Sequence, residues 1–279
     1  MALFPGCSGD ADVGEACVPP IRMALANGIL ADGAAAAFTV RLFSEAQSCT
    51  GAAITSSVIV TAAHCFPRGH GHLVLSVRRG TSGEECLGTA SAPCDPVEFA
   101  VSGSETADLV VLDARESLSG LSGVQFPFIH LEGPIPEFIG LGYGLGSYRT
   151  EPEGEPLPSS NGEHLIEGRF LTERSDGAFV VARGSEADGL VCSGDSGGPA
   201  VALVDGNIVL LGVLSDSDSE STSSCTPLNG QQFWTRLGES LSLLEAATGP
   251  CEKFALGVIS VADCTFRRSR RLACKDGPA

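Results

Sequence analysis

The chain has 279 residues, of which 43% are hydrophobic, so it can bury a substantial core in one larger domain or in two closely packed halves. Its 34 acidic residues outnumber 17 basic ones, and the formal net charge of −17 would repel phosphate backbones and anionic lipid headgroups. Composition therefore argues against nucleic acid as a partner. Such a surface ordinarily serves solubility, with steering of basic substrates as the alternative.

No apolar stretch reaches the roughly 18 to 20 residues of a membrane-spanning helix, so we expect no transmembrane segment. Eleven cysteines without the CxxC pairs of zinc or redox sites favour disulfides, and with them an oxidising compartment. The opening residues, MALFPGCSGD, lack the basic start and apolar stretch of a secretory signal. Cys7 could be the lipidated remnant of a lipoprotein cleavage site, although an ordinary disulfide cysteine is the competing interpretation. We expect a secreted, periplasmic or cell-surface protein.

Residues 1–24 contain consecutive prolines and no strand-like pattern, which is typical of a leader or pro-segment. The folded domain is expected over 25–249. Within it, short apolar segments bounded by turn residues predict strands at 37–43, 51–65, 72–79, 96–103 and 108–114, then at 138–144, 164–173, 177–184, 198–204, 207–215 and 231–237. This pattern indicates an all-β sandwich or barrel protein.

The stretch 149–162 is rich in proline, glutamate and serine, so we expect an exposed loop there. Residues 238–248 place apolar side chains on one helical face before a Gly-Pro stop, which predicts a helix. The remaining 250–279 adds three cysteines and the basic run 267–271, and is expected to be a disulfide-stapled extension. The basic run is either a solvated charged surface or a processing site.

The motif GDSGGP at 194–199 surrounds Ser196 with small residues, so the backbone can turn tightly and a substrate carbonyl can approach its amides. GDSGG also fits the GxSxG elbow of α/β-hydrolases. In that fold the histidine follows the serine, whereas all 5 histidines here precede Ser196. The order Asp, His, Ser of subtilisin is possible through Asp32, which lies in a turn before an alanine run.

His64 in TAAHC is the candidate base for Ser196, because a Cys49–Cys65 disulfide would pin it at the end of an apolar strand. Asp108 begins the apolar run DLVVL. Burying a carboxylate is costly unless it is paired, and an imidazole N–H would satisfy it. Asp113, at the other end of that run, is the structural competitor.

These motifs, with GYG at 142–144 and GVLS at 212–215, closely resemble the trypsin-like serine proteases over about residues 25–248. The resemblance implies two six-stranded antiparallel β-barrels, about 25–132 and 133–237, followed by a C-terminal helix. It implies that Ser196 is the nucleophile, His64 the general base and Asp108 its orienting partner. The Gly194 and Ser196 amides then form the oxyanion hole, and Ser215 supports the aspartate and lines the substrate channel.

The same resemblance implies a Cys192–Cys225 disulfide that frames the specificity pocket. It also implies a zymogen, in which a newly cleaved N-terminal amine inserts beside Asp195. Cleavage before Leu25, in LANG (25–28), would release that amine, and ILADG (29–33) is a further candidate start.

The specificity pocket departs from the well-known types of this family. Leu190 occupies the floor position where an aspartate would select basic residues, and Ser217 and Gln232 match two wall positions that are often glycine. Ser193 is a further substrate-binding position. We therefore expect small or medium apolar residues before the scissile bond.

Two alternatives remain open. Acidic residues in SDSDSESTSS (215–224) could attract basic side chains and make the enzyme cleave after them, although acidic loops are usually only solvated. The second alternative is that the chain is a catalytically inactive binding protein with a protease fold.

Cys86 and Cys94 are expected to form a local staple. The five remaining cysteines are Cys7, Cys17, Cys251, Cys264 and Cys274. Because their number is odd, at least one of them is free, lipidated or paired with another molecule. His70 and His72, without a carboxylate, are weak metal ligands, and we expect neither a metal nor another cofactor. The expected protein is a monomer that acts on protein or peptide substrates and could meet protein inhibitors.

Overall fold

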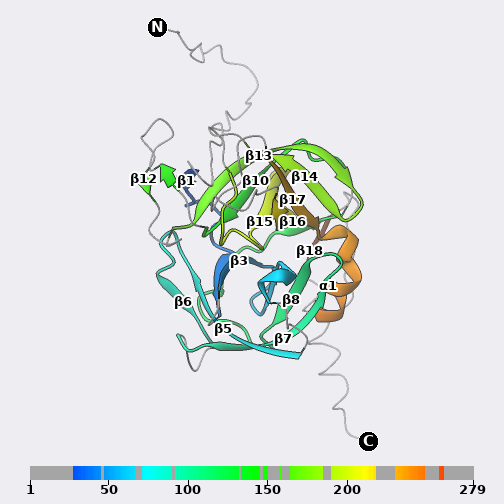
Figure 1. Ribbon diagram of the computed structural model, residues 1–279. Coiled ribbons are helices and arrows are strands. Elements are labelled where there is room, and N and C mark those ends of the chain that lie inside the picture. Colours follow the sequence, from blue (N-terminus) through cyan, green and yellow to red (C-terminus); the bar gives the residue numbers. More distant parts are fainter. Residues whose placement is uncertain are drawn as a thin grey trace, which may run out of the picture.

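The computed structural model describes residues 28–44, 47–66, 71–89, 92, 94–131, 133–144, 147–149, 157–158, 164–184, 190–217, 230–248 and 258–260. Figure 1 shows two groups of strands, one above the other, with a short helix against their side. No helix within these described ranges is long and apolar enough to cross a bilayer.

The first barrel closes because its first strand pairs with both the second strand and the fourth along the chain. Its six antiparallel strands, in barrel order, are β2 (Thr39–Phe43), β3 (Ser48–Ala53), β4 (Val58–Thr61), β8 (Leu109–Asp113), β7 (Val97–Ser104) and β5 (Gly71–Arg79). The short strand β6 (Glu85–Leu87) forms a hairpin with β5. β4 is buried along its whole length, which explains its uninterrupted apolar sequence VIVT.

The second barrel closes in the same way, since β10 pairs with both β15 and β13. Its strands are β10 (Glu137–Gly142), β15 (Pro199–Val204), β16 (Asn207–Ser217), β17 (Gln231–Arg236), β14 (Phe179–Arg183) and β13 (Ile166–Asp176). Phe138, Phe170 and Trp234 pack in its core, with the Phe138 and Trp234 rings edge to face at 5.2 Å between centroids. The expected pair of six-stranded barrels is confirmed.

Several short strands extend the second sheet. β1 (Gly28–Leu30) pairs with β13 and, in parallel, with β11 (Ser147–Arg149), which itself pairs with β12 (Leu157–Pro158). β9 (Phe128–His130) runs parallel to β16, and β18 (Val258–Ser260) pairs with β9. Part of the stretch expected as a loop therefore forms strand, and part of the expected C-terminal extension completes this sheet.

The predicted helix corresponds to a 3₁₀ turn, η2 (Gly238–Ser240), that leads into α1 (Leu241–Thr248). Leu244 and Ala247 are buried, as expected for one apolar face, and both join the core cluster that also contains strands of the first barrel. The single segment expected at 51–65 divides into β3, β4 and the 3₁₀ turn η1 (Ala63–Cys65). The chain turns back between β3 and β4, where the N–H of Ile54 donates to the carbonyl of Val58 at 2.9 Å.

The predicted Cys86–Cys94 staple is wrong. Both residues are free thiols, and the hydrogen bond to Cys86 raises the pKa of Cys94. The spacing brings the two side chains together, but a disulfide also needs a particular separation and orientation of the Cβ atoms, which spacing alone does not set. Cys86 is fixed in β6 by its pairing with Arg78 on β5.

Candidate active site

Asp108 holds His64 at two points. The Nδ1 atom of His64 lies 2.8 Å from Oδ2 of Asp108, and the backbone N–H of His64 donates to Oδ1 at 2.8 Å. His64 lies in η1, directly after β4, and a disulfide from Cys65 to Cys49 on β3 fixes this turn. The predicted Cys49–Cys65 bond is therefore present, and the imidazole can turn little relative to the carboxylate.

The backbone of Asp108 has an unusual conformation, with φ at 47° in the left-handed region, which costs a non-glycine residue about 1 kcal/mol. Its N–H donates to the carbonyl of Glu105 at 3.1 Å, which closes the turn before β8. Ser215 Oγ donates to Oδ2 of Asp108 at 2.7 Å, as the resemblance implied. The surroundings thus hold a strained residue in place so that its carboxylate faces His64.

The two rival aspartates have other surroundings. Asp113, at the end of β8, accepts a hydrogen bond from the backbone of Arg115 at 2.8 Å. Asp32 is exposed, and its charge acts on Glu167 of β13. His64 is paired with Asp108, so the order Asp, His, Ser gains no support.

The charges of this pair stabilise each other. The hydrogen bond that His64 donates to Asp108 raises the pKa of His64; burial opposes the rise, and the negative charges of Asp108 and Asp216 add to it. Burial alone would raise the pKa of Asp108, but hydrogen bonds from His64 and Ser215 outweigh it and hold that pKa below its usual range. An ionised Asp108 can only accept hydrogen bonds, so Nδ1 carries the proton and Nε2 keeps its lone pair.

The backbone of Ser196 contacts residues of the first barrel that lie close to His64. Its carbonyl accepts the N–H of Thr50 at 2.9 Å and lies 3.8 Å from Sγ of Cys65, the neighbour of His64. Among the described residues no hydrogen bond joins the Ser196 hydroxyl to the His64 ring. In enzymes without substrate such catalytic contacts are often long, and they tighten in the complex.

The loop around Ser196 presents two backbone donors. Within the described part of the chain, the N–H groups of Gly194 and Ser196 donate to no acceptor, whereas Asp195, Gly197 and Gly198 all donate to backbone carbonyls. Gly197 has φ at 79°, and a Cβ there would overlap Thr61 and Thr50 of the first barrel. The loop therefore leaves one pair of donors available to a ligand oxygen.

Asp195 is 3% exposed, and each of its oxygens accepts one backbone N–H, from Gly144 and from Cys192, at 2.7 Å. Burial raises the pKa of Asp195 to about 7, and these two donors oppose the rise. A Cβ on Gly144 would overlap this carboxylate, which explains the GYG sequence. Leu25, the expected partner of Asp195, lies outside the described residues, so that pairing remains a prediction.

Thr50 is a contact that the sequence did not reveal. It is 0% exposed, and its hydroxyl donates to the carbonyl of Gly194 at 2.8 Å and accepts the N–H of Tyr143 at 3.0 Å. It thus joins β3 of the first barrel to the loop that carries the free donors. A threonine beside Cys49 in a strand gives no signal of this role, because its partners are distant in the chain.

The specificity positions are only partly described. Leu190 is 9% exposed and packs with Cys192, whose sulfur is disulfide-bonded. The partner of Cys192 lies outside the described residues, as does Cys225. Gln232 is buried and pairs with Ser217 across β16 and β17, whereas Ser193 is exposed.

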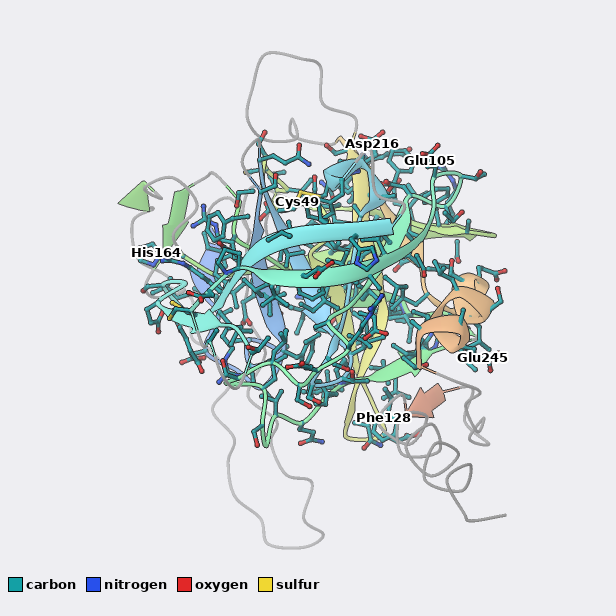
Figure 2. The ribbon with its side chains drawn as sticks, turned by 90° about the horizontal axis from the view of Figure 1, so that it is seen from below. Cys49, Glu105, Phe128, His164, Asp216 and Glu245 are labelled. Carbon is teal, nitrogen blue, oxygen red and sulfur yellow. A yellow bond between two sulfur atoms is a disulfide. The ribbon has the colours of Figure 1, made fainter. Side chains whose placement is uncertain are left out.

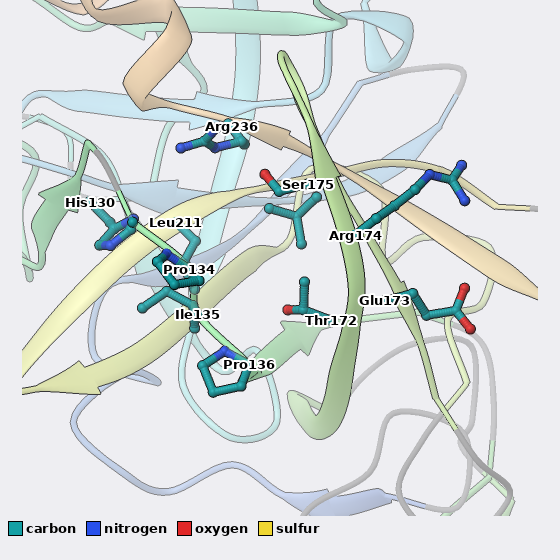
Figure 3. A pocket seen from close by; sticks show the side chains of 12 residues that line it. His130, Pro134, Ile135, Pro136, Thr172, Glu173, Arg174, Ser175, Leu211 and Arg236 are labelled. Atoms are coloured by element: carbon teal, nitrogen blue, oxygen red, sulfur yellow. The ribbon is translucent and has the colours of Figure 1, made fainter.

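A cavity of about 260 Å³ lies elsewhere on the second barrel and contains none of the predicted site residues. Figure 3 shows it between β13 and the segment that leads from β9 to β10, with His130, Ile135, Thr172 and Arg236 on its wall. Of the two weak metal ligands, His72 is paired through Nδ1 with Glu98 at 2.7 Å, and His70 is outside the described residues.

Two closed β-barrels, with a paired histidine and aspartate from one beside a serine loop from the other, give the chain a chymotrypsin-like fold. Residues 27–125 match the family model described as Trypsin. The fold also matches that of neuropsin, a serine protease expressed in the limbic system of mouse brain, with a TM-score of 0.52 and 18% sequence identity over 78% of this chain and 97% of that chain. Together these findings bear out the resemblance to the trypsin-like serine proteases, in fold and, over residues 27–125, in sequence.

Proposed function

We propose that the chain is an active serine endopeptidase that hydrolyses peptide bonds through an acyl-enzyme intermediate. The supporting observation is the His64 imidazole held through Nδ1 by an ionised Asp108 at 2.8 Å, which leaves Nε2 free to accept a proton. The protease fold implies protein or peptide substrates. The Cys49–Cys65 disulfide agrees with secretion to the extracellular space, the periplasm or the cell surface, where we propose that it acts as a monomer.

In this mechanism Ser196 Oγ attacks the scissile carbonyl while its proton passes to Nε2 of His64. The oxygen of the tetrahedral intermediate accepts hydrogen bonds from the N–H groups of Gly194 and Ser196. His64 then gives the proton to the leaving amine, which breaks the C–N bond and leaves an ester on Ser196. Water repeats the sequence and releases the acid.

We also propose that the enzyme is made as a zymogen that is cut before Leu25. Leu30 on β1 pairs with Ile166 on β13, and Ile166 pairs on its other side with Gly142, beside Asp195. The C-terminal end of β1 is therefore level with Gly142 in this sheet, and a new amine released upstream of β1 would supply the counter-charge of Asp195. Mass spectrometry of the active enzyme should find Leu25 at the N-terminus, and activity with an intact chain would contradict the zymogen.

For specificity we propose a preference for small or medium apolar residues before the scissile bond. Leu190 supplies no counter-ion at the pocket floor, and the buried Gln232 fills part of the wall. Peptide-library cleavage tests this preference directly, since predominant cleavage after lysine or arginine would overturn it.

The central experiment is labelling with a fluorophosphonate, followed by mapping of the modified peptide. The wild-type enzyme should take the label on Ser196, because only an activated serine reacts rapidly. Ser196→Ala should lose the label, while Ser242→Ala, which changes an exposed serine on α1, should keep it. A folded wild-type protein that takes no label even after cleavage before Leu25 would instead be the inactive, protease-fold binding protein.

A further inference from the structure

Within the described residues, one edge of β16 is unpaired beside the candidate site. The strand is paired on both sides up to Val213, and the Leu214 backbone is bonded to Gly197 and Gly198. Beyond that point, within the described residues, Asp216 and Ser217 pair only with β17. An extended peptide whose carbonyl reaches Ser196 would run along this edge as an added strand.

Asp216 lies on that edge next to the paired His64 and Asp108. The preceding residue, Ser215, donates its hydroxyl to Asp108 at 2.7 Å, and the charge of Asp216 helps to raise the pKa of His64. Asp216 is exposed, and Figure 2 shows it at the same end of the molecule as Glu105, whose carbonyl closes the turn before Asp108. The carboxylate therefore borders the path of a bound peptide.

Asp216 has no counter-charge among the described residues. None of the ion pairs found there includes it. Its Oδ1 instead accepts the backbone N–H of Ser217 at 2.7 Å. The carboxylate thus occupies a backbone donor of this strand, and its negative charge has no ion-pair partner among the described residues.

We propose that Asp216 is a specificity-determining residue that selects substrates with a lysine or arginine shortly before the residue that enters the pocket. This proposal rests on the proposed protease function and concerns the positions that precede the pocket residue. A basic side chain would pair with Asp216 and release the Ser217 N–H to the peptide carbonyl. An acidic side chain would be repelled and would leave that donor covered.

The expected effect is modest because the pair is exposed. A carboxylate and an ammonium group at a surface contribute about two- to fivefold in affinity, and long-range attraction to this acidic protein adds to the association rate at low salt. The preference should therefore weaken as ionic strength rises, since salt screens exposed charges.

The test uses peptide sets that share one cleaved residue and carry lysine, glutamine or glutamate at each of the preceding positions. For the wild-type enzyme, kcat/KM with lysine should exceed kcat/KM with glutamate by about fivefold at one or more positions at low salt. Asp216→Asn should bring this ratio close to one, and Asp216→Lys should invert it.

The matched control is Asp205→Asn, which makes the same charge change at the opposite end of β16. Asp205 lies in the β15–β16 turn with φ at 50°, a conformation that asparagine tolerates, so this variant should keep the wild-type ratio. No preference in the wild type, or one that survives Asp216→Asn, would overturn the role of Asp216. Fluorophosphonate labelling of Ser196 separates that failure from failure of the proposed protease function, because only the latter abolishes the label.

Discussion

At the level of single residues, Asp108 brings the candidate site together. It accepts hydrogen bonds from the backbone and ring of His64 and from the hydroxyl of Ser215, which comes from the other barrel. Three donors keep the carboxylate ionised in spite of its burial, and an ionised carboxylate in turn stabilises a protonated His64. The same contacts that fix the geometry therefore set the proton affinity of the base.

This coupling predicts the pH dependence of catalysis. His64 must be neutral to accept a proton, so kcat/KM should fall as the pH drops through its raised pKa. Asp108→Asn removes the main cause of that rise, so the acid limb should move to lower pH, and kcat should fall by about 10⁴-fold. Measuring kcat/KM from pH 5 to pH 9 checks both effects. An acid limb that stays in place would contradict the assignment.

At the level of strands, β13 contains a partly buried carboxylate for which the described residues provide no hydrogen bond or ion pair. Glu167 pairs in register with Ile29 on β1 and with Leu141 on β10. Burial and, to a smaller extent, the negative charge of Asp32 together raise the pKa of Glu167 to about 7. The folded state therefore favours the protonated form. This contribution to stability is complete below the unfolded value of 4.5 and is lost as the pH rises through about 7.

Glu167→Gln should accordingly stabilise the protein at high pH and change little at low pH. Glutamine stays neutral, so at pH 8 the free energy of unfolding should increase by about 1 to 3 kcal/mol, whereas at about pH 4 the variant and the wild type should agree. Urea unfolding at both pH values measures this difference. Glu116→Gln, at an exposed position, is the control, and an equal gain from both variants would contradict the burial argument.

At the level of the whole molecule, local patterns predicted what local physics determines. The main barrel strands, the single helix and the His64–Asp108 pair follow from apolar runs, turn residues and short motifs. The addition of β1 and β18 to the second sheet was not predicted, because these short pairings depend on distant partners. The role of Thr50 was missed for the same reason. The failed Cys86–Cys94 staple shows that proximity in sequence does not set the geometry of a bond.

The two barrels are joined by buried side chains that lie beside the candidate residues. Thr235 Oγ1 of β17 donates to the carbonyl of Ala107 at 2.7 Å, directly before Asp108. The Tyr143 hydroxyl donates to the carbonyl of Gly80 at 2.8 Å, and Thr50 joins β3 to Gly194. Contacts that hold the barrels together therefore also align the base from one barrel with the serine loop of the other.

Thr50→Val tests this dual role, because valine keeps the shape of the side chain but not its hydroxyl. The carbonyl of Gly194 and the N–H of Tyr143 would both lose a buried hydrogen-bond partner, so the free energy of unfolding should fall by about 2 to 4 kcal/mol. The loop with the free N–H donors would loosen as well, and kcat should fall by about tenfold or more.

Thr39→Val is the matched control for this experiment. Thr39 is also 0% exposed, but its hydroxyl donates to the carbonyl of Ala35 at 2.8 Å, just ahead of β2 and within the first half of the chain. This variant should lose about 1 kcal/mol of stability and keep the wild-type kcat, because no contact between the barrels changes. Equal losses of kcat in the two variants would mean that activity follows overall stability. A selective loss in Thr50→Val would mean that the barrel contact itself positions the oxyanion donors.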